Sequence, residues 1–293
     1  MRKIDQTYQI SKLLTRIENG EEFDVSELLV SDRQPFVMGL TGPPGTGKST
    51  IISKLAKRLS EQKKKVAIIA NDPTSKLSKG SLLGDRIRMD ELWNLDNVYI
   101  RSVPSRGRKG GLNYFVVEMI YAFYMFGYSY IFVETTGVGQ DEVEIADVAD
   151  LVINVSVPYL GDEVQSIKAG LNEVTDIYVI NKIDLGNYEI YAKYLYLAIK
   201  KNKWGWEPKI VGVSALKEKN LDELIKLIED YRPFYRKKLK ETVLRRFSFM
   251  VASRLEYIVD SKIEQTSMES LMADYIKNKS LNETIKKLIS DAL

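Results

Sequence analysis

A glycine-rich stretch has the residue types and spacing of a phosphate-binding loop. It reads Gly42-Pro43-Pro44-Gly45-Thr46-Gly47-Lys48-Ser49-Thr50 and completes the pattern G-x-x-x-x-G-K-[ST]. Glycines let the backbone curl so that several N–H groups point at phosphate oxygens, and a following helix adds the positive end of its dipole. Lys48 would bridge the β- and γ-phosphates, and the Ser49 hydroxyl would ligate Mg²⁺. An accidental glycine-rich turn is the alternative, but an apolar run at 36–40 and a helical pattern at 51–59 favour a nucleoside triphosphate site.

A second motif indicates which base is bound. Asn181-Lys182-Ile183-Asp184 follows a short apolar run at 177–180. The Asp184 carboxylate can accept hydrogen bonds from N1–H and the 2-amino group of guanine, whereas adenine lacks both donors and would leave the acid unpaired. Asn181 would brace the loop, and the stem of Lys182 would cover the face of the base. Ser214-Ala215-Leu216 follows the next apolar run, so we expect this segment to complete the pocket for the base. Together with the Asp184 carboxylate, this favours GTP over ATP.

Carboxylates near the expected phosphate site are candidates for the metal shell and for catalysis. The run at 130–133 ends at Glu134-Thr135-Thr136-Gly137, where Glu134 can hold the water shell of Mg²⁺ and the Gly137 N–H can meet the γ-phosphate. Two further acids, Asp72 and Asp85, follow the run at 66–70, and each has the alternative of being merely solvated. We therefore expect the metal to be held by Ser49, Asp72, Asp85 and Glu134, with Lys48, Glu134 and Asp85 as the catalytic groups.

The chain contains no cysteine and no histidine, which excludes several chemistries. Disulfides, thiolate zinc sites, thiol nucleophiles, Ser-His-Asp mechanisms and imidazole metal ligation all need one of these residues. The 43 basic and 40 acidic residues give a net charge of +3, which is too balanced to indicate a nucleic-acid partner. No secretory signal is visible, and the apolar segment 114–133 is better interpreted as a buried helix, a turn and a strand than as a membrane span. These features predict a cytoplasmic protein.

Seven short apolar runs alternate with amphipathic segments and predict the fold. They lie at 36–40, 66–70, 98–100, 130–133, 151–155, 177–180 and 210–213. Continuous apolar runs suggest strands buried on both faces, with helices as crossovers. We expect an α/β, doubly wound, mostly parallel sheet of the P-loop NTPase kind, which binds ligands at the carboxyl ends of its strands. The predicted divisions are an N-terminal helical arm at 1–34, a GTPase domain at 35–238 and a C-terminal helical extension at 239–293.

Beyond these motifs, the order of several segments resembles the MeaB/ArgK-type GTPases, which include proteins of the LAO/AO transport ATPase-like family. The resemblance is collinear from about residue 36 to 216 and rests on the following segments: the phosphate loop, Asn71-Asp72-Pro73-Thr74-Ser75, residues 80–89, Pro104-Ser105-Arg106-Gly107, residues 134–140 and residues 161–170. It implies a dimeric GTPase that chaperones a coenzyme-B12-dependent acyl-CoA mutase of the methylmalonyl-CoA mutase type, gating cofactor loading and protecting the mutase. It also implies an additional switch that signals to the mutase, with Gly161, Asp162, Glu163, Gln165 and Lys168 as its residues.

Several alternatives remain open at this point. Some family members are labelled as kinases linked to lysine/arginine/ornithine transport, but the sequence offers no distinct segment that would bind an acceptor, so that function ranks second. A nickel insertase is a related option that the missing histidine and cysteine exclude. Gln140 could position the attacking water or be structural, and Arg106 and Arg108 could stabilise charge on the phosphates or bind elsewhere. The helical pattern at 247–259 could pack on its own domain or form a dimer interface.

Overall fold

A computed structural model describes residues 3–72, 89–105, 108, 111–137, 142–158, 170–186, 188–199 and 205–290. The described residues form a parallel seven-stranded sheet in the order β3-β2-β4-β1-β5-β6-β7. The strands are β1 (Phe36–Thr41), β2 (Val66–Asp72), β3 (Val98–Pro104), β4 (Tyr130–Glu134), β5 (Leu151–Ser156), β6 (Ile177–Ile180) and β7 (Lys209–Gly212). The predicted doubly wound α/β fold is confirmed, and each predicted run coincides with a strand to within a few residues.

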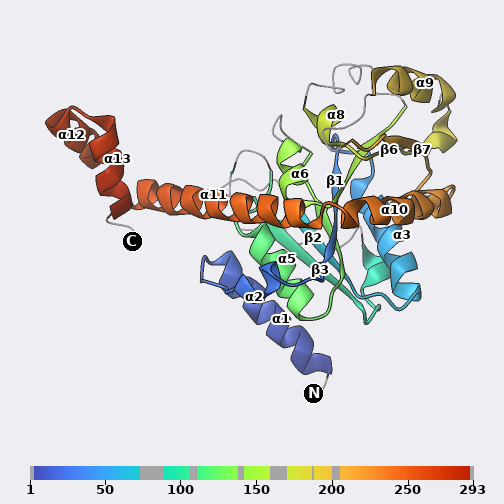
Figure 1. Cartoon of the computed structure of the whole chain (residues 1–293), viewed down its shortest axis with the longest axis horizontal. Helices are drawn as coiled ribbons and strands as arrows, with labels where there is room; N and C mark the ends of the chain where they lie inside the picture. The colour runs from blue at the N-terminus through green and yellow to red at the C-terminus, as the bar shows by residue number, and fades with distance from the viewer. Residues whose placement is uncertain are drawn as a thin grey trace.

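Helices cover both faces of the sheet (Figure 1). The α-helices are α1 (Lys3–Glu18), α2 (Ser26–Leu29), α3 (Lys48–Glu61), α5 (Val116–Met125), α6 (Ile145–Val148), α8 (Leu171–Val174), α9 (Tyr188–Ala198), α10 (Leu221–Arg236), α11 (Leu239–Gln265), α12 (Met268–Asn278) and α13 (Leu281–Ser290). Short 3-10 helices are η1 (Asp90–Leu92), η2 (Glu142–Glu144) and η3 (Ile183–Leu185). The segment 114–133 is indeed a buried helix followed by a strand, and no described helix combines the length and apolar character that a membrane crossing needs.

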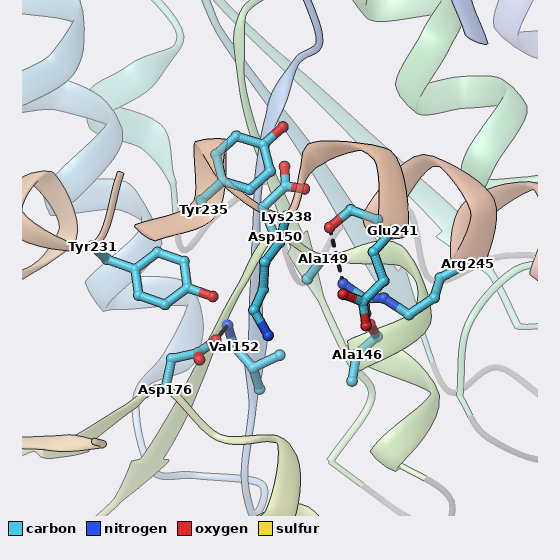
Figure 2. Close-up of a pocket in the computed structure, with 11 residues that line it drawn as sticks. Ala146, Ala149, Asp150, Val152, Asp176, Tyr231, Tyr235, Lys238, Glu241 and Arg245 are labelled. Atoms are coloured by element: carbon cyan, nitrogen blue, oxygen red, sulfur yellow. Dashed lines mark hydrogen bonds between the residues drawn. The ribbon is translucent and has the colours of Figure 1, made fainter. Parts of the chain in front are cut away.

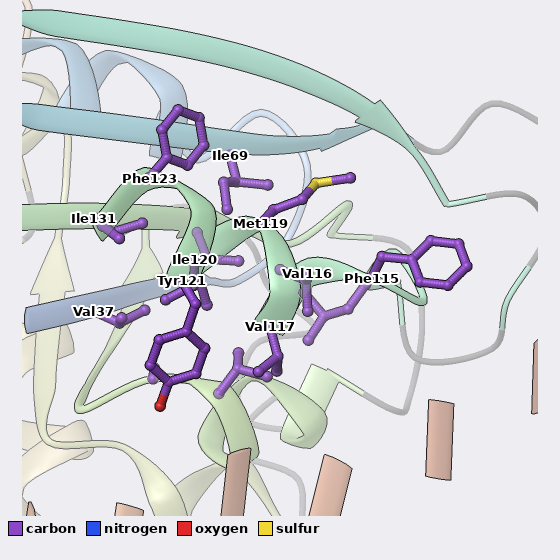
Figure 3. Close-up of a cluster of buried hydrophobic side chains, with 14 of the residues drawn as sticks. Val37, Ile69, Phe115, Val116, Val117, Met119, Ile120, Tyr121, Phe123 and Ile131 are labelled. Carbon is purple, nitrogen blue, oxygen red and sulfur yellow. The ribbon is translucent and has the colours of Figure 1, made fainter. Parts of the chain in front are cut away.

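The two faces of the sheet bury separate apolar cores. Successive residues of a strand point to opposite faces, so in β1 Val37 belongs to one core and Phe36 and Met38 belong to the other. The first core lies beneath α1, α5, α6 and α11, and Figure 3 shows α5 placing Ile120 and Tyr121 over strands β1 and β4. The second core lies beneath α3 and α10. Because both faces are covered, strands β1, β4 and β6 are buried along their whole length, as their continuous apolar runs predicted, whereas the edge strand β3 is mostly half-buried and carries Arg101 and Ser102.

Helix α11 is a 27-residue rod that carries α12 and α13 at its far end, away from the sheet (Figure 1). Its fully buried face differs from the apolar pattern at 247–259, for which the sequence left open packing on its own domain or a dimer interface. The buried residues of α11 are Thr242, Arg246, Phe249 and Ser253, whereas Phe247, Val251 and Leu255 are 46%, 43% and 53% exposed. Arg246 can occupy the packed face because Asp150 and the Val148 carbonyl at the edge of the sheet accept its hydrogen bonds, which hydrophobic periodicity cannot reveal.

Two aspartates mark the amino-terminal edge of the sheet. Asp150 precedes β5 and accepts a hydrogen bond from the Val37 N–H (2.7 Å), and Asp176 precedes β6 and accepts one from the Val152 N–H (2.8 Å). Arg246 of α11 donates to Asp150 over 2.7 Å, and both side chains are fully buried. Burial alone would lower the pKa of Arg246, but the attraction of Asp150 outweighs it and raises that pKa. The base of α11 is therefore anchored to the sheet by a buried ion pair.

Beside this ion pair lies a polar cavity of about 10 Å³, enough for about one water molecule (Figure 2). Figure 2 shows Tyr231 and Tyr235 of α10, Arg245 of α11 and the two aspartates around it. The cavity is far too small for a nucleotide. The cavity also lies at the opposite edge of the sheet from the expected phosphate loop. It belongs to the region in which α10 and α11 pack against the amino-terminal edge of the sheet.

Candidate nucleotide-binding site

The sequence motifs converge at the carboxyl-terminal edge of the sheet. The phosphate loop follows β1, Glu134 ends β4, and the Asn181 motif follows β6. Strand β1 lies between β4 and β5, and β6 is the next strand beyond β5, so these three strand ends lie along one edge of the parallel sheet. This is the position at which doubly wound folds bind ligands.

The phosphate loop wraps around the side chain of its own lysine. Lys48 is buried, and its Nζ donates to the carbonyl oxygens of Gly42 (2.6 Å) and Pro43 (3.2 Å). Helix α3 begins at Lys48 after Gly47, which adopts φ +95° and supplies no side-chain cap. The amides of the first turn are therefore directed into the loop, as anion binding at a helix N-terminus requires. Of the predicted loop residues, 42–47 lie between β1 and α3, and 48–50 form the first turn of α3.

The predicted metal-shell pair lies beside this loop. The Ser49 hydroxyl donates to Glu134 Oε1 over 2.7 Å, and both residues are buried. Asn71, near the end of β2, donates from Nδ2 to the Glu134 carbonyl (3.0 Å) and accepts the Asn113 N–H (2.9 Å). Asn71 thus fixes the end of β4, a role that the sequence analysis missed. Its position directly after a buried apolar run was the available signal.

Gly137 packs directly against the phosphate loop. A Cβ at this position would lie 2.8 Å from Lys48 Nζ, 3.0 Å from the Gly42 carbonyl oxygen and 3.1 Å from Pro44 N, and its φ is +78°. Both the left-handed backbone and the lack of space require glycine. The predicted γ-phosphate contact thus lies within van der Waals distance of the lysine that would bind the same phosphate.

The guanine motif holds the phosphate loop from the other side. Asn181 donates from Nδ2 to the Thr46 carbonyl (2.8 Å), and its Oδ1 accepts the N–H groups of Lys182 (2.8 Å) and Ala215 (3.1 Å). Lys182 Nζ donates to the Gly45 carbonyl over 2.8 Å. One amide therefore joins the predicted base-binding segments to the phosphate loop.

Asp184 stands next to the third predicted segment of the base pocket. A hydrogen bond from Ser214 lowers the pKa of Asp184, and Lys217, whose Nζ is 3.5 Å from Asp184 Oδ2, lowers it further. The carboxylate is thus ionised at neutral pH and can accept two N–H groups. Ser214 and Ala215 are buried, while Leu216 is 81% exposed at the rim.

Other predicted residues cannot be placed in this way. Asp85, Gly161, Asp162, Glu163, Gln165 and Lys168, together with Gln140 and Arg106, lie outside the described residues. Asp72 ends β2, but its side chain is not described. Within the described ranges no three acidic side chains lie together as they would around a metal ion, and of the predicted metal-shell residues Ser49 and Glu134 are the pair that the structure brings into contact there.

Arg108, which the sequence offered as a residue that could stabilise charge on the phosphates, already has other partners. It is buried, and its guanidinium contacts Glu144 and Glu256.

Glu142 is a second residue that the sequence analysis missed. Its Oε2 accepts hydrogen bonds from the Gly42 N–H over 3.1 Å and from the Thr41 hydroxyl. No local pattern around Glu142 signals this contact, which joins residues about 100 positions apart.

Comparison with known proteins agrees with these motifs. Residues 13–270 match the family model described as methylmalonyl Co-A mutase-associated GTPase MeaB. A Pyrococcus abyssi relative is 39% identical over 264 residues, covering 87% of this chain and 82% of the relative. GTPase ArgK of Escherichia coli is 39% identical over 201 residues (67% of this chain, 61% of the relative). The mouse mitochondrial methylmalonic aciduria type A homolog is 38% identical over 203 residues (67% and 49%).

Solved structures share the fold. A crystal structure of an LAO/AO transport system kinase aligns over 97% of each chain with a TM-score of 0.57 and 23% identity. HypB from Helicobacter pylori, solved in complex with nickel, aligns over 71% of this chain and 92% of its own with a TM-score of 0.50 and 17% identity. At these identities the likeness shows the P-loop NTPase architecture alone. The family match therefore shows, in agreement with the phosphate loop, the guanine motif and the fold, that this chain belongs to the MeaB family of methylmalonyl-CoA mutase-associated GTPases.

Proposed function

We propose that this protein binds and hydrolyses GTP with Mg²⁺ as a chaperone of a coenzyme-B12-dependent acyl-CoA mutase, gating cofactor loading and protecting the mutase. The observation that carries the nucleotide part is the hydrogen bond from Asn181 to the Thr46 carbonyl, which holds the guanine motif and the phosphate loop together. The mutase client is inferred from the family, whose description names that enzyme.

In the proposed mechanism, water attacks the γ-phosphate while the protein positions the groups and neutralises charge. Lys48 exchanges its carbonyl partners for β- and γ-phosphate oxygens, and the Gly137 N–H meets the γ-phosphate from the opposite side. Ser49 and Glu134 supply adjacent hard oxygen atoms, which suit Mg²⁺, with Asp72 and Asp85 as further proposed ligands. Bound Mg²⁺ would neutralise charge that develops on the phosphate oxygens. No strong general base is required, so slow turnover that a partner accelerates is expected.

A dimer is the proposed working form, and α11 is its proposed interface. Leu244, Phe247, Val251 and Leu255 are each exposed and follow one another at intervals of three, four and four residues. This spacing places them along one side of a helix, where an apolar seam favours association with a second helix. We therefore assign residues 239–293 to a dimerisation extension, residues 35–238 to the GTPase domain and residues 1–34 to an N-terminal arm. The proposed partner switch at residues 161–168 would report the nucleotide to the mutase.

The client is tested by affinity capture from native extract of the source organism. Wild-type protein and Lys48→Ala are used as baits in the presence of GTP, and the captured proteins are identified by mass spectrometry. We expect a B12-dependent mutase subunit with the wild type, in an amount that changes with Lys48→Ala. Recovery of no B12-dependent subunit with either bait would contradict the chaperone role, while GTP hydrolysis by the purified chain tests the enzymatic role separately.

A further inference from the structure

The short helix η2 directs two carboxylates toward different parts of the molecule. Glu142 is buried, and its Oε2 accepts the Gly42 N–H over 3.1 Å and the hydroxyl of Thr41. Thr41 is the last residue of β1 and Gly42 the first of the phosphate loop. The Glu142 carboxylate therefore fixes the peptide at which the strand becomes the loop.

The backbone at this peptide has little freedom to adopt another conformation. Gly42 adopts φ +127°, and a Cβ there would lie 2.1 Å from the backbone oxygen of Val155. The amides of a phosphate loop bind phosphate only when their orientation is maintained, and a misplacement of about 1 Å can cost about 100-fold in rate. A buried acceptor at the first peptide maintains the orientation without touching the reacting atoms.

Two residues further along, Glu144 faces helix α11. Arg108 lies between Glu144 and α11. Its Nη1 is 3.3 Å from Glu144 Oε2, and its Nε is 2.8 Å from Oε2 of Glu256, a residue of α11. Its guanidinium also lies 4.8 Å from the ring centre of Phe249, another residue of α11. The Arg108 side chain is only 4% exposed, whereas Glu144 and Glu256 are 31% and 42% exposed, so solvent partly screens the two pairs while the buried guanidinium relies on them for its charge partners.

We propose that η2 transmits the position of α11 to the phosphate loop. Glu142 is a positioning residue for GTP binding and hydrolysis, and Arg108 holds the same helical turn against α11 through Glu144 and Glu256. The inference rests on the proposed GTPase function and adds a means of regulation to it. A partner or second copy that moves α11 changes the placement of Glu142 and with it the phosphate loop.

A double-mutant cycle tests the connection. The full-length wild type, Glu142→Ala, Arg108→Met and the double variant are compared by equilibrium binding of a non-hydrolysable fluorescent GTP analogue and by single-turnover hydrolysis of GTP with Mg²⁺. We expect Glu142→Ala to weaken binding or slow hydrolysis at least about tenfold, because two hydrogen bonds to a buried carboxylate are lost. Arg108→Met should have a smaller effect of the same kind, and the double variant should be little worse than Glu142→Ala alone.

Conservative variants separate positioning from folding. In Glu142→Gln the amide oxygen still accepts both hydrogen bonds, so activity within about threefold of wild type is expected. Thr41→Val removes a single donor and serves in the cycle if Glu142→Ala does not fold. Matched controls are Arg101→Met, since Arg101 pairs with Glu18 of α1, and Glu91→Ala, since Glu91 accepts hydrogen bonds from Ser53 and Lys54 of α3. Both controls should leave GTP binding within about twofold of wild type.

Two results would overturn the inference. If Glu142→Ala binds and hydrolyses GTP within twofold of wild type, Glu142 has no positioning role. If the effects of Glu142→Ala and Arg108→Met multiply in the double variant, the two residues act independently. Either result, obtained with a wild-type chain that hydrolyses GTP, overturns this inference alone, whereas a wild-type chain that binds no GTP overturns the proposed function as well.

Discussion

The side chain of Asn181 donates a hydrogen bond to the carbonyl of Thr46, 135 positions earlier in the chain, over 2.8 Å. The same amide accepts the Ala215 N–H, so three segments that follow different strands share one buried group. The predicted base-binding and phosphate-binding segments are therefore joined through one side chain, and under the proposed function a base that binds poorly at Asp184 should also be held poorly at Lys48.

Exchanging Asp184 for asparagine should change the preferred base. The new amide would present an N–H where the carboxylate accepts, which opposes guanine and suits the 2-oxo group of xanthine. Since hydrogen bonds to a charged group are worth about 1.5–3 kcal/mol each, the affinity for GTP should fall about 100-fold, while that for xanthosine triphosphate should rise. Competition binding measures both affinities. Asp222→Asn, at an exposed acid on α10, is the control, and an unchanged preference in Asp184→Asn would refute the assignment of the base.

Removing the buried amine of the phosphate loop should abolish most of the activity. Lys48→Ala deletes the proposed contact to the β- and γ-phosphates, and we expect GTP hydrolysis to fall by on the order of 100-fold or more. Lys54→Ala is a matched control on the same helix, because Lys54 pairs with Glu91 and Glu218 instead. Phosphate release assays compare the two variants, and equal losses in both would argue against a specific role for Lys48.

Charges placed on the exposed side of α11 should prevent dimerisation. Val251→Glu with Leu255→Glu introduces two acids into the proposed seam without touching Arg246 or Phe249 on the packed face. Light scattering with GTP bound should report a dimer for the wild type and a folded monomer for this variant. Leu197→Glu, at a 75% exposed leucine of α9, should remain dimeric. A wild-type chain that is monomeric with GTP bound would contradict the proposal.

The stability of the fold should depend on pH through Glu118 of α5. Burial raises the pKa of Glu118 to about 7 from an ordinary value of 4.5, although Arg254 opposes this shift. Below about pH 4.5 both the folded and the unfolded state carry the proton. As the pH rises from 4.5 to 7, the unfolded state releases the proton first, so the free energy of unfolding falls by up to about 3 kcal/mol.

The variant Glu118→Gln should remove this dependence. Urea denaturation at pH 5 and pH 8 should show that the variant gains stability relative to wild type as the pH rises. Glu189→Gln, at an exposed glutamate of α9, should show no such relative change. Parallel behaviour of wild type and Glu118→Gln across this range would show that Glu118 does not titrate there.

Breaking the buried ion pair of α11 should destabilise the whole chain. Arg246→Met leaves Asp150 buried without its cation, at an expected cost of about 3–5 kcal/mol in the free energy of unfolding. Adding Asp150→Asn removes the uncompensated charge and should recover part of that loss. Denaturation in urea measures both variants, and a double variant less stable than Arg246→Met would indicate that the contact of Asp150 with the Val37 N–H dominates.

The sequence predicted those parts of the fold and site that depend on neighbouring residues. The apolar runs became strands, and the residues of the phosphate loop and of the Asn181 motif lie next to one another, because each motif is a continuous segment placed at a strand end. Glu142, Asn71 and Arg246 were not predicted as contacts. Each acts on a residue roughly 60 to 100 positions away, so its partner is set by the order of the strands in the sheet. Arg246 also lies on a helix face that periodicity would assign to solvent.

The two anchors of α11 give that helix the geometry of a lever. Arg246 holds it at the amino-terminal edge of the sheet, and ten residues later Glu256 meets Arg108, which follows the carboxyl end of β3. At 1.5 Å per residue the two anchors are about 15 Å apart, and the end of α11 at Gln265 lies about 28 Å from the first. If α11 pivots at Arg246, a displacement at Glu256 is about doubled where α11 ends, so a movement of less than 1 Å at the Arg108 contact becomes a larger one at the end of the helix.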